Sequence, residues 1–129
     1  MFKIKTETIP KDFQHTSPAG AEVRVLMGNP LGGIAHCTLK DMKISKPVRH
    51  KTVSEFWHVL SGKGEIWRKE NNQELVTRLE AGVTIDIPLG TDFQYRSLEG
   101  DLVFICVTMP PWPGHDEVEY VSQGCWEPN

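Results

Sequence analysis

Hydrophobic and polar residues alternate along most of the chain, in short runs. This period of two is typical of β-strands with one buried face, whereas a helix would repeat its apolar residues every three or four positions. The runs are AEVRVLM, GIAHCTL, EFWHVLSG, GEIWRK, ELVTRL, VTIDIP, DFQYRSL and LVFICVTM. The pattern therefore predicts an all-β chain.

Glycines, prolines and a pair of asparagines separate these runs, at intervals of roughly ten residues. Such residues favour tight turns, so we expect turns at NPLGG, GKG, KENNQE, LEAG, PLG and LEGD. Short strands with this spacing predict a sandwich or a barrel.

The last segment, residues 110–129, is rich in proline and aromatic residues and does not alternate. It predicts an extended strap with one helical turn, held down where Trp112 and Trp126 bury their rings against the barrel or a second subunit. We expect a packing strap rather than a lid. The length of 129 residues predicts a single domain, 1–129, with a core barrel at about 20–110 and the strap at 110–129.

The composition is that of an ordinary globular protein, with 39% hydrophobic and 24% charged residues and a formal net charge of −3. No long basic stretch is present, which argues against binding to nucleic acid or to an anionic membrane. The N-terminus lacks the apolar core of a signal peptide, and no segment is apolar enough to span a bilayer. Cys37, Cys106 and Cys125 are odd in number and widely spaced, so neither a disulfide framework nor a zinc knuckle is indicated. We expect a cytoplasmic protein.

Two stretches resemble the sequence motifs of the cupin superfamily, which are small double-stranded β-helix, or jelly-roll, barrels. The residues with matching spacing are His50, Glu55 and Gly62 in the first motif and Gly82, Pro88 and Gly90 in the second. The resemblance implies a jelly-roll barrel with an internal pocket and assembly as a homodimer.

The motifs are incomplete at four positions. Met42 and Val48 replace the opening glycine and first histidine of the first motif, and Phe93 and Ser97 replace the histidine and asparagine of the second. Two of the four usual metal ligands are therefore absent. The resemblance implies the barrel and its pocket, with His50 as the remaining histidine ligand.

His50 and Glu55 are the candidate metal ligands. Imidazole and carboxylate together suit a divalent transition metal, here Mn, Fe, Ni, Cu or Zn, and a third ligand could come from His36 or His115. His58 lies an odd number of residues from Glu55, so strand alternation places it on the opposite face.

The same residues can act without a metal. Imidazole exchanges protons near neutral pH, the Glu55 carboxylate can orient the His50 ring, and Tyr95 offers a phenol as acid or hydrogen-bond donor. These observations predict a barrel that binds a small polar or acidic molecule and acts as a metal-dependent or acid/base enzyme, such as an isomerase, a lyase or a dioxygenase-like enzyme. The alternative is a non-catalytic ligand-binding or sensing barrel without metal.

Three further predictions concern surfaces. Phe56, His58 and Leu60 form an outward-facing apolar row, which supports the homodimer because exposed apolar patches often mark interfaces. Arg24 and Arg78 are interpreted as solvated. The segment HDE, residues 115–117, is interpreted as surface charge or a helix cap.

Overall fold

The computed structural model describes residues 4–129, and these form an all-β fold, as the alternation predicts. One 3-10 turn, η1 (His115–Glu117), interrupts the last segment. The strands are β1 (His15–Thr16), β2 (Glu22–Asn29), β3 (Gly32–Leu39), β4 (Val48–His50), β5 (Ser54–Glu70), β6 (Gln73–Leu79), β7 (Thr84–Ile87), β8 (Asp92–Met109) and β9 (Val118–Tyr120).

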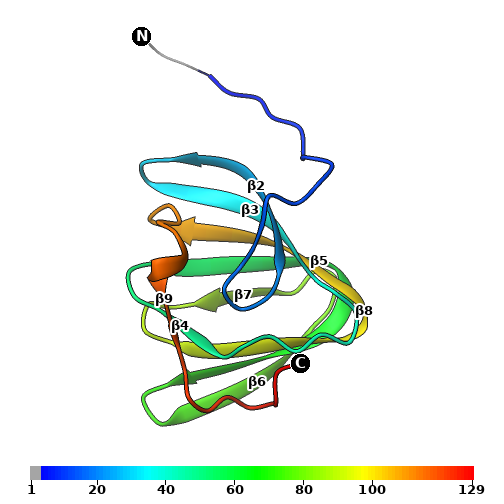
Figure 1. Ribbon diagram of the computed structural model, residues 1–129, viewed down its shortest axis with the longest axis vertical. Helices are drawn as coiled ribbons and strands as arrows, with labels where there is room; N and C mark the ends of the chain where they lie inside the picture. Colours follow the sequence, from blue (N-terminus) through cyan, green and yellow to red (C-terminus); the bar gives the residue numbers. More distant parts are fainter. Residues whose placement is uncertain (1–3) are drawn as a thin grey trace.

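The strands form one antiparallel sheet that curls into the wall of a barrel (Figure 1). The main path runs β1-β2-β3-β8-β4-β9, and β5 pairs with β8 on one side and with β6 and β7 on the other. The β2–β3 hairpin lies at one end of the molecule and β6 at the other (Figure 1). The long strands β5 and β8 pair with each other, and they connect β3 on the β8 side to β6 and β7 on the β5 side.

Two of the predicted turns are wrong, because β5 and β8 run through them. β5 continues through Gly62 and Gly64 with irregularities in its register to β8, and β8 continues through LEGD. A Cβ atom at Gly62 or Gly64 would collide with the main-chain carbonyl of Asp101 or Arg96. These glycines therefore permit close approach of two bent strands rather than a reversal of the chain. At KENNQE the turn is confirmed, with φ of 54° at Asn71 and 63° at Asn72.

Strand alternation decides which side chains enter the barrel. On β5 the residues Glu55, Trp57 and Val59 are buried, while Phe56, His58 and Leu60 point outward and are exposed. The prediction for His58 is confirmed, and its Nδ1 atom lies 2.7 Å from the Thr84 hydroxyl on the outer face. Further buried residues, one later on β5 and the rest on other strands, extend the same interior; they include Val23, Cys37, Leu39, Ile66, Leu79, Ile85, Phe93, Tyr95, Leu102, Phe104 and Cys106.

The C-terminal strap crosses the barrel as predicted, and both of its tryptophans contact the barrel. The Trp112 ring lies 5.3 Å from the His50 ring, and the Trp126 ring lies 4.3 Å from the Arg96 guanidinium. Between them, β9 pairs with β4. The side chain of Gln94 accepts hydrogen bonds from the main-chain N–H groups of Cys125 and Trp126, which holds the end of the strap. No helix within residues 4–129 is long and apolar enough to cross a membrane.

Candidate functional site

The barrel holds a cavity of about 250 Å³ between its strands and the strap, and the cavity opens to solvent beside the exposed residues Val25 and Ile34. His50, Glu55 and Tyr95 all line it. Its walls are largely apolar, and they carry five aromatic side chains, Trp57, Phe93, Tyr95, Phe104 and Trp112. None of the described residues that line it is a lysine or an arginine. A concave apolar site with a few polar groups is the usual form of a small-molecule site.

His50 enters the cavity because β4 is short and strictly alternating. Val48 and His50 are buried, and Arg49 between them points outward, where its Nε donates to Asp92 Oδ1 at 2.6 Å. Val48 pairs with Phe93 of β8, and the Phe93 ring packs edge-on against the His50 ring at 5.1 Å. Two apolar side chains thus border the imidazole.

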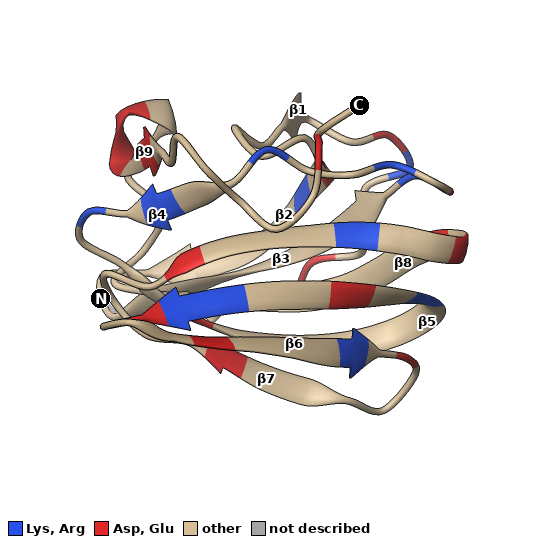
Figure 2. Cartoon of the chain, turned by 90° about the horizontal axis from the view of Figure 1, so that it is seen from below, with Lys and Arg blue, Asp and Glu red and all other residues tan. Residues whose placement is uncertain are grey.

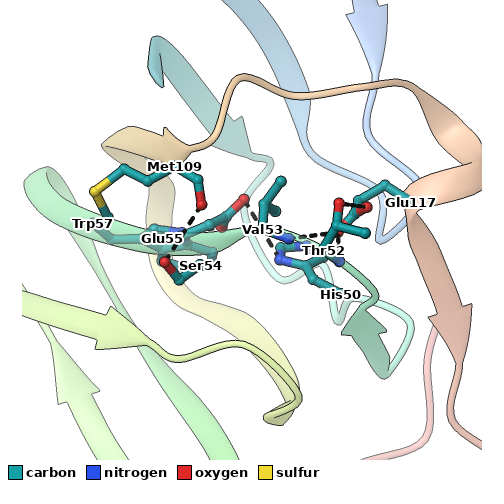
Figure 3. A network of polar contacts seen from close by, with 8 residues as sticks. All are labelled: His50, Thr52, Val53, Ser54, Glu55, Trp57, Met109 and Glu117. Carbon is teal, nitrogen blue, oxygen red and sulfur yellow. Dashed lines mark hydrogen bonds and ion pairs between the residues drawn. The ribbon is translucent and has the colours of Figure 1, made fainter. Parts of the chain in front are cut away.

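Glu55 faces His50 across a gap. Its Oε2 atom lies 3.8 Å from His50 Nδ1, beyond hydrogen-bond distance, and both side chains are buried (Figure 3). Trp57 Nε1 donates to the other carboxylate oxygen, Oε1, at 2.8 Å. His50 Nδ1 is buried without a hydrogen-bond partner. A buried polar atom without a protein partner is uncommon, so this nitrogen is available to a water molecule or ligand group in the cavity.

Glu117 of η1 anchors the strap beside His50 and is buried, so its interpretation as surface charge is wrong. Its carboxylate accepts bonds from the Thr52 and Val53 N–H groups at 2.7 and 2.9 Å and from the Thr52 hydroxyl (Figure 3). Burial alone would raise the pKa of Glu117. The hydrogen bonds, with a smaller contribution from nearby His50, outweigh burial and hold this pKa below its usual value. The turn between β4 and β5 is thereby tied to the strap.

Other polar groups of the cavity stay protonated at neutral pH. Burial raises the pKa of the Tyr95 phenol far above its usual value. Burial, followed by the nearby Glu55 carboxylate, raises the pKa of the Cys37 and Cys106 thiols in the same way. Tyr95 is therefore a hydrogen-bond donor rather than a base, and neither thiol is a ready nucleophile.

The donors present do not fit a metal ion. Stable sites for transition metals use three or four protein ligands, and the described residues contain no cluster of three or more histidine, cysteine, aspartate or glutamate side chains placed to hold one. Val48 and Phe93 occupy the positions of the two missing ligands, and neither can coordinate.

The proposed third ligands lie elsewhere. His36, on β3, faces away from the cavity that its neighbour Cys37 enters, and His115 lies exposed on η1 with its ring 6.1 Å from that of His15. Arg24 also lies outside the cavity; its guanidinium donates to the main-chain carbonyls of Pro10 and Lys11. Arg78 is exposed on β6.

Three contributors to the cavity, Trp57, Cys37 and Cys106, were not singled out from the sequence, and a fourth, Trp112, was expected only to hold down the strap. Trp57 shares the parity of Glu55, and Cys37 and Cys106 lie at inward positions of their strands, so alternation alone could have placed these side chains in the cavity. Trp112 lies beyond the alternating region, and its contact with His50 follows only from the path of the strap.

No protein-family model matches the sequence, and no curated protein matches it. Solved structures match its fold. KdgF from Halomonas sp. is 19% identical with a TM-score of 0.65, and the match covers 77% of this chain and 87% of that one. Pac13 from Streptomyces, described as a nucleoside dehydratase, is 13% identical with a TM-score of 0.72, and 92% of each chain is covered.

Oxalate decarboxylase from Bacillus subtilis is 14% identical with a TM-score of 0.76; the match covers 94% of this chain and 33% of that one. All three matches share the cupin fold, and two of them, Pac13 and oxalate decarboxylase, carry the names of enzymes. At these identities the likeness is one of fold.

Proposed function

Because the chain has the cupin fold, with a cavity that holds one buried imidazole and one buried carboxylate, we propose that it is a metal-independent acid/base enzyme. Its substrate is a small uncharged molecule. His50 and Glu55 exchange a proton with that molecule in an isomerisation or in an elimination such as the loss of water.

One observation carries the proposal: the 3.8 Å gap between His50 Nδ1 and Glu55 Oε2. No atom fits between two atoms that are 3.8 Å apart, but a substrate hydroxyl that approaches both from the cavity side can lie about 2.8 Å from each, and the carbon-bound proton beside such a hydroxyl is then within reach of both groups. Trp57 holds the carboxylate by its other oxygen, so Oε2 stays directed at the gap. An acid and a base positioned on one substrate in this way typically accelerate proton transfer by about 10²- to 10⁴-fold.

The lining of the cavity favours an uncharged substrate with a flat ring. A phosphate or carboxylate would enter an apolar space without a lysine or arginine to pair with it, and Glu55 would repel it. Aromatic walls offer edge and face contacts to a ring. This narrows the polar or acidic ligand expected from the sequence to an uncharged one.

Tyr95 acts in the proposal as a hydrogen-bond donor to the bound molecule. Because its phenol stays protonated, it can stabilise negative charge that develops on a substrate oxygen. Substitution Tyr95→Phe keeps the ring and removes the donor, so binding of an oxygen-bearing ligand should weaken by about tenfold.

The comparisons support the reaction class in general terms. Pac13, whose barrel matches almost the full length of this chain, is described as a nucleoside dehydratase, and structures of its variants contain uridine. An uncharged nucleoside and the loss of water are both compatible with the cavity described above.

A ligand screen by thermal denaturation tests the substrate class. Uncharged nucleosides and sugars are compared with carboxylates and phosphates, with a chelator present throughout. A ligand that binds only the folded state raises the melting temperature. We expect the largest shifts from uncharged rings, reduced in Tyr95→Phe and unchanged in the outer-face control Leu60→Ser. Preferential stabilisation by anions, or by ligands only after metal is added, would contradict the proposal.

A receptor without catalysis is the second candidate. It is favoured by the replacement of two usual metal ligands by Val48 and Phe93, which turns part of the site into an apolar wall. A receptor would bind the same ligands as the enzyme and leave them unchanged, so turnover separates the two.

A further inference from the structure

Strand β6 forms an open edge of the sheet. Among residues 4–129 it pairs only with β5, and it lies at the end of the molecule away from the β2–β3 hairpin (Figure 1). Leu75 and Val76 are 58% and 45% exposed. An open edge with exposed apolar residues is a template for pairing with another strand.

The turn before β6 determines which main-chain groups are free. Asn71 and Asn72 both have positive φ, as in a two-residue hairpin loop, and Glu70 pairs with Gln73 on either side of them. Gln73 therefore exchanges its N–H and C=O with β5, and so do the odd-numbered residues after it. The N–H and C=O groups of Glu74, Val76 and Arg78 point to the open edge.

We propose that β6 pairs with β6 of a second copy of this chain, antiparallel and about a twofold axis at Val76. In this register Val76 faces Val76 of the second copy, and Glu74 faces Arg78 of the second copy. Every one of these residues directs its N–H and C=O toward the partner, so each pair exchanges two hydrogen bonds. A twofold arrangement makes both halves of the interface identical.

The charges on β6 select this register. The strand carries one acidic residue, Glu74, and one basic residue, Arg78, at equal distances from Val76 (Figure 2). Antiparallel pairing about Val76 places opposite charges together on both sides of the axis, whereas an in-register parallel pair would place like charges together. Charges on a sheet edge ordinarily discourage pairing, but these complement each other across the axis.

The side chains around the edge are compatible with this contact. Trp67 Nε1 donates to Glu74 Oε1 at 2.8 Å, which orients the carboxylate and leaves Oε2 free for the arginine. Leu75 would lie opposite Thr77 of the second copy and lose much of its exposure. The rival surface is the outer row of Phe56, His58 and Leu60, which is also exposed but has no comparable charge pairing.

Charge reversal tests the register by sedimentation equilibrium at micromolar concentration and low salt. The wild-type chain is expected to sediment as a dimer. Arg78→Glu places like charges together twice and should weaken dimerisation at least about tenfold. The double variant Glu74→Arg with Arg78→Glu exchanges the two charges and should restore the dimer.

Two controls separate this edge from its rival and from misfolding. Phe56→Ser with Leu60→Ser should leave the dimer intact. Val76→Pro removes an N–H that points to the open edge, so the monomer should stay folded by circular dichroism while the dimer is lost. A monomeric wild type, an Arg78→Glu variant with wild-type association, or a dimer dissociated by the outer-row substitutions would overturn the proposal. None of these results bears on catalysis in the cavity.

Discussion

At the scale of single residues, the cavity separates groups that can exchange a proton from groups that cannot. Burial keeps Tyr95, Cys37 and Cys106 in their protonated forms. The proposal assigns the acid/base roles to His50 and Glu55, whose facing atoms lie 3.8 Å apart, with aromatic rings beside the imidazole. The proposed chemistry therefore depends on these two side chains and on the group that bridges them from the cavity.

The thiols provide a direct check on this burial. Cys125 is exposed, whereas Cys37 and Cys106 are buried; burial raises the pKa of all three thiols, and it raises those of Cys37 and Cys106 far above the usual value. Because the thiolate is the reactive form, Ellman's reagent should modify one thiol quickly in the native protein and all three after denaturation. The fast phase should disappear in Cys125→Ser. Three fast thiols in the native protein would contradict the burial of Cys37 and Cys106.

At the scale of elements, Glu117 joins the strap to the turn between β4 and β5, next to the residue that carries the imidazole. The strap is thus part of the wall of the site, since Trp112 packs against His50 from the same segment. Loss of this anchor should affect both the stability of the strap and the position of His50.

Substitution Glu117→Gln tests the anchor through pH. The folded-state pKa lies below that of the unfolded chain, so the ionised carboxylate stabilises the fold above about pH 4.3, and this contribution is lost as the pH falls through the folded pKa. In urea unfolding, we expect the variant to be less stable by about 2 kcal/mol at pH 7, with a smaller difference in acid.

The matched control is Glu119→Gln on the neighbouring strand. Glu119 is exposed, and its ion pair with Arg49 Nη1 is long at 3.4 Å. Loss of this pair should change the free energy of unfolding by less than about 0.5 kcal/mol. Equal effects of the two substitutions, or a Glu117→Gln effect that does not depend on pH, would show that the carboxylate is no anchor.

Alternation predicted the strands well, because period two follows directly from a sheet with one buried face. It failed at Gly62–Gly64 and at LEGD, where glycine and exposed polar residues signal a turn but the chain continues as a bent strand. Gly62 serves the close passage of β5 past β8. This contact joins residues far apart in the sequence. The pattern of neighbouring residues therefore cannot distinguish a glycine that permits close strand contact from a glycine in a turn.

At the scale of the whole molecule, the barrel brings together residues from β3, β4, β5, β8 and the strap around one cavity. The resemblance to the cupin motifs, together with strand parity, placed His50, Glu55 and Tyr95 in a common interior. They did not place Trp112 or the anchor Glu117, because the strap has no periodic pattern. They also left the third metal ligand open, and the folded chain places neither His36 nor His115 in the cavity.

The barrel geometry predicts how a metal site could be built. Val48 and Phe93 face each other across β4 and β8, beside His50. The double substitution Val48→His with Phe93→His would give four donors with His50 and Glu55, and should bind about one Zn²⁺ or Ni²⁺ per chain. Bound metal should also raise the melting temperature of the variant.

Elemental analysis after dialysis measures this directly, with the wild-type chain as control. The wild type should retain far less than one equivalent. Stoichiometric metal in the wild type that disappears in His50→Ala would contradict the conclusion that the donors of the cavity do not fit a metal ion. A folded double variant without metal affinity would show that the four positions do not converge.

Turnover by metal-stripped protein tests the central claim most directly. The uncharged ligand that stabilises the wild type most is incubated with it in heavy water and chelator, and proton NMR follows the ligand. We predict conversion with uptake of deuterium, reduced about 100-fold or more in both Glu55→Gln and His50→Gln and unchanged in Leu60→Ser. A bound ligand that stays unchanged, or conversion that begins only after metal is added, would contradict the assignment of a metal-independent acid/base enzyme.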